Sequence, residues 1–391
     1  MNIPSCYVDG YAEAWKVDAK LAEQYIRHTN VGDPVADAVV AALATTASPA
    51  GVHRIIAEAL EGRGDVPKGT PQVLRDLLVE TGTLPDWFDR ELYRDATRAF
   101  LRNSDMVLGA LVGGAIIEGF STLISRSFRI RGRITTNGVR RLKQNLQQLV
   151  DQYLPGGIEP GGDGWRLTIR IRLVHAQARR LIATSDEWDH SVYGVPLSAA
   201  HMLLGAAAFS GRLMQHVSKL GGDFSKRDRE AYVHVWRHTG LLLGIPDEIM
   251  FRDFESSVRC FEIGSLCEPP PAEDAIIMAN SIINSAPIVL GYEKPDERRS
   301  MAAFMYQVSR ELIGNRLADQ LRYPAARLKK EVPLLRLRNL GNRILRRLAP
   351  PLASYRSMER FSSLFAVSNL GRYEHKYSLP TSVFDEDSAE W

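Results

Sequence analysis

The sequence is poor in cysteine and shows no secretory leader at its start. Its three cysteines, Cys6, Cys260 and Cys267, cannot form a disulfide framework, and the Cys260–Cys267 spacing lacks the second ligand pair of a zinc module. Residues 1–16 have no apolar segment behind a basic start, so no signal peptide is expected. These absences predict a cytoplasmic protein of a reducing compartment.

The chain also lacks an apolar run long enough to cross a membrane. The longest run, Met106–Phe120, is shorter than the roughly 20 residues that a spanning helix needs, so it predicts a buried helix and no transmembrane segment. Its small residues Gly109, Gly113 and Gly114 permit the close approach of another helix or of a flat ligand. Glu118, near its end, is either a carboxylate satisfied within the core or a general base in a dry pocket.

Charge is nearly balanced over the whole chain but is distributed unevenly. The net charge is +3, with 45% apolar and 24% charged residues, which excludes disorder as the main state. Between Asp296 and Pro350, 13 lysines and arginines stand against 5 aspartates and glutamates. The basic stretch Arg322–Arg347 predicts either a surface helix packed on the core or a peripheral contact with an anionic membrane. No base-reading motif accompanies it, so no nucleic-acid partner is expected.

Helical periodicity dominates the chain and predicts an all-α fold. Apolar–polar alternation is scarce, and no repeat of fixed period appears. Composition divides the chain into an N-terminal helical extension, 1–85, an apolar helical core, 86–290, and basic C-terminal helices with an acidic tail, 291–391. We expect the C-terminal helices to pack on the core. The loop Pro155–Gly164 is the clearest break within that core.

The helix after this loop places His175 between two chemically different faces. At about 100° per residue, an apolar stripe on one side consists of Ile171, Val174, Ala178 and Ile182. A polar stripe on the other side consists of Thr168, Arg172 and Arg179. This pattern is typical of a haem-binding helix, in which imidazole binds the iron and an arginine meets a propionate. A core-edge histidine bonded to a backbone carbonyl is the alternative.

The preceding amphipathic run, 136–153, carries a polar stripe beside its apolar face. Arg141, Asn145 and Gln148 form this stripe, spaced i, i+4 and i+7. The stripe predicts either a solvated flank or a cation and an amide directed into a pocket.

Other histidines offer weaker candidates for a site. His234 and His238 have the i, i+4 spacing of a two-histidine metal site, but no glutamate follows the first, which disfavours a zinc hydrolase. His201, at the start of an apolar helix, is a further candidate for a pocket residue.

Short motifs occur in a fixed order between residues 86 and 270. They are Gly132-Arg133, Arg140-Arg-Leu-Lys-Gln-Asn145, Gly162-Asp-Gly-Trp165, Arg172-Leu-Val-His-Ala-Gln-Ala-Arg179, Glu187-Trp-Asp189, Tyr193-Gly-Val-Pro196, Phe209-Ser210 and Val235-Trp-Arg-His-Thr-Gly-Leu-Leu-Leu-Gly-Ile-Pro246. Together they resemble the family of latex-clearing proteins, or rubber oxygenases, and the fungal oxygenases that cleave the prenyl chain of mycophenolic acid precursors.

The resemblance implies a globin-like all-α core that holds haem b. It implies His175 as the axial ligand of the haem iron and Arg141 as a polar residue on the distal side. Either Arg172 or Arg179 would pair with a propionate. The catalytic glutamate of the family has only Glu118 as a weak candidate here.

The sequence departs from rubber oxygenases beside the distal arginine. Those proteins have a lysine and a threonine at the third and fourth positions after it, where this chain has Gln144 and Asn145. Glutamine is a poor iron ligand, so a lysine-capped iron is not expected, whereas Asn145 still hydrogen-bonds. These departures, together with the missing export signal, predict a substrate other than polyisoprene.

The expected function is oxidative cleavage of a C=C bond with O₂ in an apolar terpenoid or unsaturated lipid. Arg141 and Asn145 would position the oxygen. Two other functions remain open: a haem protein that senses or carries a gas or an electron without turnover, and a cofactor-free helical protein that binds lipid or membrane through Arg322–Arg347.

Overall fold

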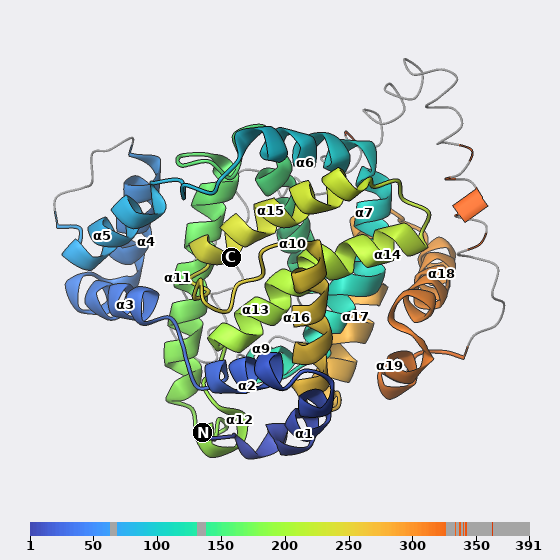
Figure 1. The fold of residues 1–391 in the computed structure, drawn as a ribbon, viewed down its shortest axis with the longest axis horizontal. Helices are drawn as coiled ribbons and strands as arrows, with labels where there is room; N and C mark the ends of the chain where they lie inside the picture. The colour runs from blue at the N-terminus through green and yellow to red at the C-terminus, as the bar shows by residue number, and fades with distance from the viewer. Residues whose placement is uncertain are drawn as a thin grey trace.

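The computed structural model of this chain is built from helices, as Figure 1 shows. It describes residues 1–62, 69–130 and 138–325, together with positions 333, 336, 337, 339, 341 and 362. These described residues contain no strand, so the predicted all-α class is confirmed. Most of the basic stretch Arg322–Arg347 lies outside the described residues, and its membrane contact stays a prediction.

The N-terminal part forms one helix pair and one group of three helices. After the short turn η1 (Ser5–Tyr7), these helices are α1 (Val8–Val17), α2 (Ala19–His28), α3 (Pro34–Thr46), α4 (Pro49–Glu61) and α5 (Gln72–Thr81). The Asp33 side chain caps α3 by accepting from Ala36 N, and Pro34 occupies its first turn. Helices α3, α4 and α5 lie on one side of the molecule, where α3 packs against α11 (Asp163–Ala183) (Figure 1).

The middle part supplies most of the core. Its remaining helices are α6 (Arg90–Arg102), α7 (Ser104–Ala110), η2 (Leu111–Ala115), α8 (Ile116–Phe120), α9 (Ile124–Ile130), α10 (Gly138–Tyr153), α12 (His190–Tyr193), α13 (Ala199–Ala207), η3 (Ala208–Arg212), α14 (Leu213–Lys219), α15 (Lys226–Leu242) and α16 (Phe254–Cys267). Helix α15 packs along α6, and α10 contacts both α11 and α17 (Glu273–Val289). A capping box between Ser225 and Asp228 starts α15, which fixes where this core helix begins.

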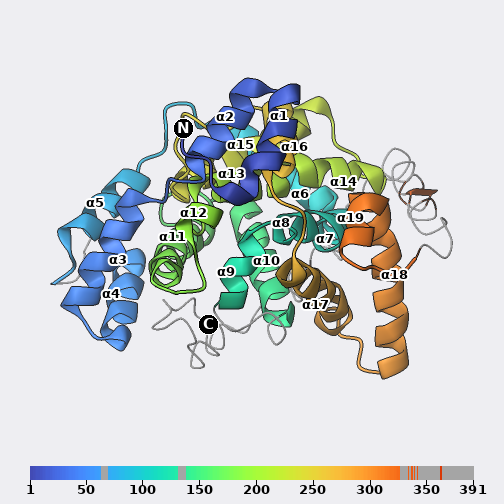
Figure 2. The same cartoon turned by 90° about the horizontal axis from the view of Figure 1, so that it is seen from below.

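The C-terminal described helices close the opposite side of the molecule. Figure 2 shows α18 (Pro295–Ile313) and α19 (Asn315–Gln320) across the molecule from α3, α4 and α5. Helix α18 packs on η2 and α17. One hydrophobic cluster includes Tyr7, Leu204 and Tyr323 and so draws on all three segments that composition separated.

The apolar run Met106–Phe120 forms a buried helix, as predicted, with a π-helical turn, η2, in its middle. Its glycines serve the packing of neighbouring helices. A Cβ atom added at Gly113 would lie 3.7 Å from the Ser309 backbone of α18, and one at Gly114 would collide with the His216 ring of α14. Of the two expectations for these small residues, close helix packing is therefore the one that the structure shows.

Among the described helices, none has by itself both the length and the apolar composition of a membrane span. The helix Arg90–Arg102 and the segment Ser104–Phe120 meet those criteria only when taken together, and they are bent by 81° at their junction.

Candidate haem site

The hairpin of α10 and α11 brings the two strongest sequence candidates to the same level. At its closed end, Trp165 N donates to Gly157 O over 2.8 Å, and Gly164 contacts the backbone of Asp151 and Gln152 so closely that a Cβ atom has no room. His175 lies as many residues from Gly164 as Arg141 lies from Gln152. With equal rise per residue in antiparallel helices, positions 141 and 175 lie at about the same distance from the closed end of the hairpin. The side chain of Arg141 is outside the described residues.

His175 stands out in the buried middle of α11. Every residue from 171 to 179 is buried except His175, which is partly exposed. Its apolar neighbours Ile171 and Val174 are only 6% and 8% exposed. The imidazole is therefore the one side chain in this stretch that reaches accessible space, with hydrocarbon on its flank.

The two arginines beside His175 bind carboxylates of the α3 N-terminus. Arg172 makes a buried two-pronged ion pair with Asp33, at 2.6 Å from Nε and 3.0 Å from Nη2. Arg179 contacts Asp37 at 2.9 Å and donates to Leu197 O at 2.6 Å. These pairs fix α11, and with it His175, against α3. A haem propionate is the predicted partner of Arg172 or Arg179. It would have to share the guanidinium with the aspartate that already binds it.

We expect the two aspartates to differ in their contribution to stability. In Asp33→Asn, the buried Arg172 charge loses its partner, which costs about 3–5 kcal/mol. In Asp37→Asn the loss is smaller, about 1.5–3 kcal/mol, because the Asp37 side chain is 40% exposed against 9% for Asp33 and Arg179 keeps its bond to Leu197 O. Urea unfolding of both variants measures the difference, and equal losses would contradict it.

Asn145 and Gln144 are partly exposed on α10, whereas Leu142 and Leu146 on the same helix are buried. Asn145 thus belongs to the polar stripe that the sequence predicted, and it lies one turn from position 141. Its part in positioning oxygen stays a prediction.

Glu118 belongs to a different buried cluster, between α8, η3 and α14. Arg212 donates to the Glu118 carboxylate from Nε over 2.9 Å and from Nη2 over 2.6 Å. His216 Nε2 lies 2.8 Å from Oε2 of the same carboxylate. Burial alone would raise the pKa of Glu118, but His216 and Arg212 lower it to about 2. A carboxylate with so low a pKa is a weak base, so this geometry favours the satisfied core carboxylate over the general base.

His234 and His238 pack among aromatic side chains. The rings of both lie against Phe88, and His234 Nε2 accepts from Asp89 N at 3.0 Å. Burial lowers the pKa of each histidine from 6.5 to about 4. In the described part of the chain, no three His, Cys, Asp or Glu side chains are grouped to hold a metal. These contacts favour a role of His234 and His238 in core packing and capping over a role as metal ligands.

The same two histidines predict how stability depends on pH. Since their pKa is lower in the folded chain than the ordinary 6.5, the native state disfavours their protonation. Their contribution is complete above pH 6.5 and is lost as the pH falls towards about 4. We expect His238→Leu to flatten the fall in unfolding free energy between these limits, measured by urea titration. The exposed His190→Gln should keep the wild-type slope, and an unchanged slope in His238→Leu would refute the assignment.

Glu268 and His201 form a second carboxylate–histidine network, which no motif in the sequence predicts. Buried Glu268 accepts from Tyr25 Oη at 2.6 Å and lies 3.3 Å from His201 Nε2, whose ring nitrogen also lies 3.0 Å from Tyr7 Oη. Glu268 also accepts from Leu123 N at 3.1 Å, just before α9. The sequence suggests His201 only as a weak candidate for a pocket residue. Its partners Tyr7 and Glu268 are distant in the sequence, so no local spacing predicts these contacts.

Known proteins share this fold and match part of this sequence. The fold is similar to that of latex clearing protein LCP in its closed state, with a TM-score of 0.63 and 18% identity over 91% of this chain and 95% of that one. The rubber oxygenase of Streptomyces sp. (strain K30) is 27% identical over 231 residues, or 56% of this chain and 54% of that protein. The chain thus spans about half the length of this relative.

Residues 97–344 match the family described as "ER-bound oxygenase mpaB/B'/Rubber oxygenase, catalytic domain". Because this match extends over more than half of the chain, the protein belongs to that family. The resemblance drawn from the motifs between residues 86 and 270 is confirmed.

Proposed function

We propose that this chain is a haem-dependent oxygenase that cleaves a C=C bond of an apolar terpenoid or unsaturated lipid with O₂. The observation that carries the proposal is the setting of His175. Within a domain of the rubber oxygenase family, it is the partly exposed imidazole in an otherwise buried helical stretch, at the level of position 141.

The residues around His175 fit a haem. Imidazole is a common iron ligand, and the apolar flank of Ile171 and Val174 suits a porphyrin face. His175 would hold haem b through its iron, and the bound haem would supply the oxygen chemistry. The ion pairs of Arg172 and Arg179 with the N-terminus of α3 hold α11, the helix that carries His175, in place.

The polar stripe of α10 would act on the oxygen side. We infer that Asn145 orients O₂ by hydrogen bonding and that Arg141 provides a positive charge beside it. Gln144 occupies the place of a lysine in rubber oxygenases and is a poor iron ligand. This difference supports a substrate other than polyisoprene.

The reaction consumes one O₂ and one alkene and yields two carbonyl fragments, each carrying one oxygen atom. The test is incubation of haem-loaded protein with ¹⁸O₂ and squalene or a monoterpene, followed by mass spectrometry of the products. Carbonyl products with one ¹⁸O each support the proposal. A haem-loaded protein that binds O₂ but forms no such product would be a sensor or carrier, and one that takes up no haem would be a lipid-binding protein.

A further inference from the structure

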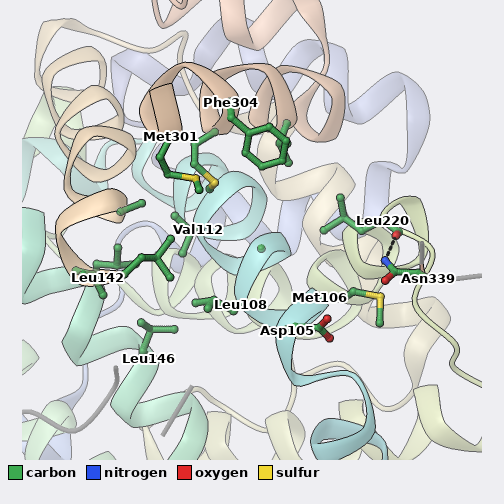
Figure 3. A pocket seen from close by; sticks show the side chains of 16 residues that line it. Asp105, Met106, Leu108, Val112, Leu142, Leu146, Leu220, Met301, Phe304 and Asn339 are labelled. Atoms are coloured by element: carbon green, nitrogen blue, oxygen red, sulfur yellow. Dashed lines mark hydrogen bonds between the residues drawn. The ribbon is translucent and has the colours of Figure 1, made fainter. Parts of the chain in front are cut away.

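A cavity of about 530 Å³ lies on another face of α10 (Figure 3). Leu142 and Leu146 of α10, Val112 of η2 and Phe304 of α18 line it. The volume falls within the roughly 300–1,000 Å³ of small-molecule sites. The cavity is therefore large enough to hold a ligand rather than a single water.

The cavity is separate from the candidate haem site. On α10, Leu142 and Leu146 lie about 100° around the helix from Arg141 and Asn145. None of the residues that line the cavity belongs to α11. The cavity thus lies where α10 faces α17 and α18, and α11, which carries His175, takes no part in its lining.

The lining is mostly apolar and contains two polar side chains, Asp105 and Asn339. Met106, Met301 and Met305 contribute flexible thioether side chains that fit chains of varied shape. Figure 3 shows Asn339 beside Leu220 and Asp105 beside Met106, both across the picture from Leu142 and Leu146. Such an arrangement suits a ligand with a long hydrocarbon part and a single polar head.

Asn339 defines the chemistry of that head. Its side chain is 1% exposed, and its Nδ2 donates to Leu220 O over 2.7 Å. Its Oδ1 is buried and has no hydrogen-bond partner among the described residues. A buried acceptor without a donor is unfavourable. A ligand that brings a hydrogen-bond donor to Asn339 Oδ1 is therefore bound more tightly than one without a donor. An ionised carboxylate head has no hydrogen to donate to this oxygen, so an anionic head is disfavoured.

We propose that this cavity binds a long-chain primary alcohol, with its chain along the methionines and its hydroxyl donating to Asn339 Oδ1. Aliphatic and isoprenoid alcohols share this chemistry. Binding does not require the haem, because the lining lies outside α11, so failure of one assignment leaves the other intact.

The head-group test is calorimetric titration of the full chain with 1-decanol, decyl methyl ether and decanoate, with geraniol as the isoprenoid arm. The alcohol is expected to bind about three- to ten-fold more tightly than the ether, which has the same chain but no donor. Decanoate should bind more weakly than the alcohol. Tighter binding of geraniol than of 1-decanol would identify the isoprenoid source. Equal affinities of alcohol and ether, or tighter binding of decanoate, would overturn the proposal.

A second experiment tests where the ligand binds, by enlarging a side chain that lines the cavity. Val112→Phe should weaken 1-decanol binding by ten-fold or more, whereas Val79→Phe, at a position 73% exposed on α5, should leave it unchanged. Ala286→Leu fills the same space from α17 by a smaller increment and serves if Val112→Phe does not fold. Circular dichroism verifies the fold of each variant. Undiminished affinity in a folded filling variant would place the ligand elsewhere.

Discussion

Replacing His175 by alanine is expected to abolish haem binding. The imidazole is the predicted protein ligand of the iron, and α11 offers no second histidine to take its place. Protein produced with added haem should then show no Soret band, while its helical circular dichroism remains. The matched control is His190→Ala, which removes an exposed histidine of α12 and should leave the haem content unchanged.

A second variant separates ligation from folding at this position. His175→Gly leaves a space of imidazole size, so free imidazole added at millimolar concentration should restore haem binding and part of the spectrum. Rescue assigns the metal bond to the side chain. A wild-type spectrum in His175→Ala without imidazole would show that another residue binds the iron.

Replacing Glu118 by glutamine is expected to lower the free energy of unfolding by about 3–5 kcal/mol. The neutral amide leaves the Arg212 charge without its partner in a cluster where His216 is fully buried. Urea unfolding measures the loss. The surface pair Arg54–Glu58, whose side chains are 75% and 51% exposed, gives the control: Glu58→Gln should cost less than about 1 kcal/mol.

Further measurements separate a structural role of Glu118 from a catalytic one. Adding Arg212→Met to Glu118→Gln removes the unpaired charge and should recover part of the lost stability. In wild type, the contribution of Glu118 is complete above its ordinary pKa of 4.5 and is lost as the pH falls towards about 2. A variant of wild-type stability that has lost only turnover would instead make Glu118 the catalytic base.

The sequence by itself determined the fold class and the main candidate for the iron ligand. Helical periodicity is a local property, since residues three and four apart share a face whatever surrounds them. It was therefore sufficient for α10 and α11, and it placed His175 at the seam of two faces. Ordered motifs likewise identified the family, because they record residue type and order and need no contact.

Only the tertiary structure decided which side chains meet. The partners of Arg172, Arg179 and Glu118 lie on other helices. A helical wheel shows on which face of its own helix each residue lies, but it does not show which side chain the residue binds. The same limit concealed the network of Glu268, whose contacts join α2, α13 and α16. Contacts between residues far apart in sequence depend on how helices pack, and packing is a property of the assembled core rather than of any one segment.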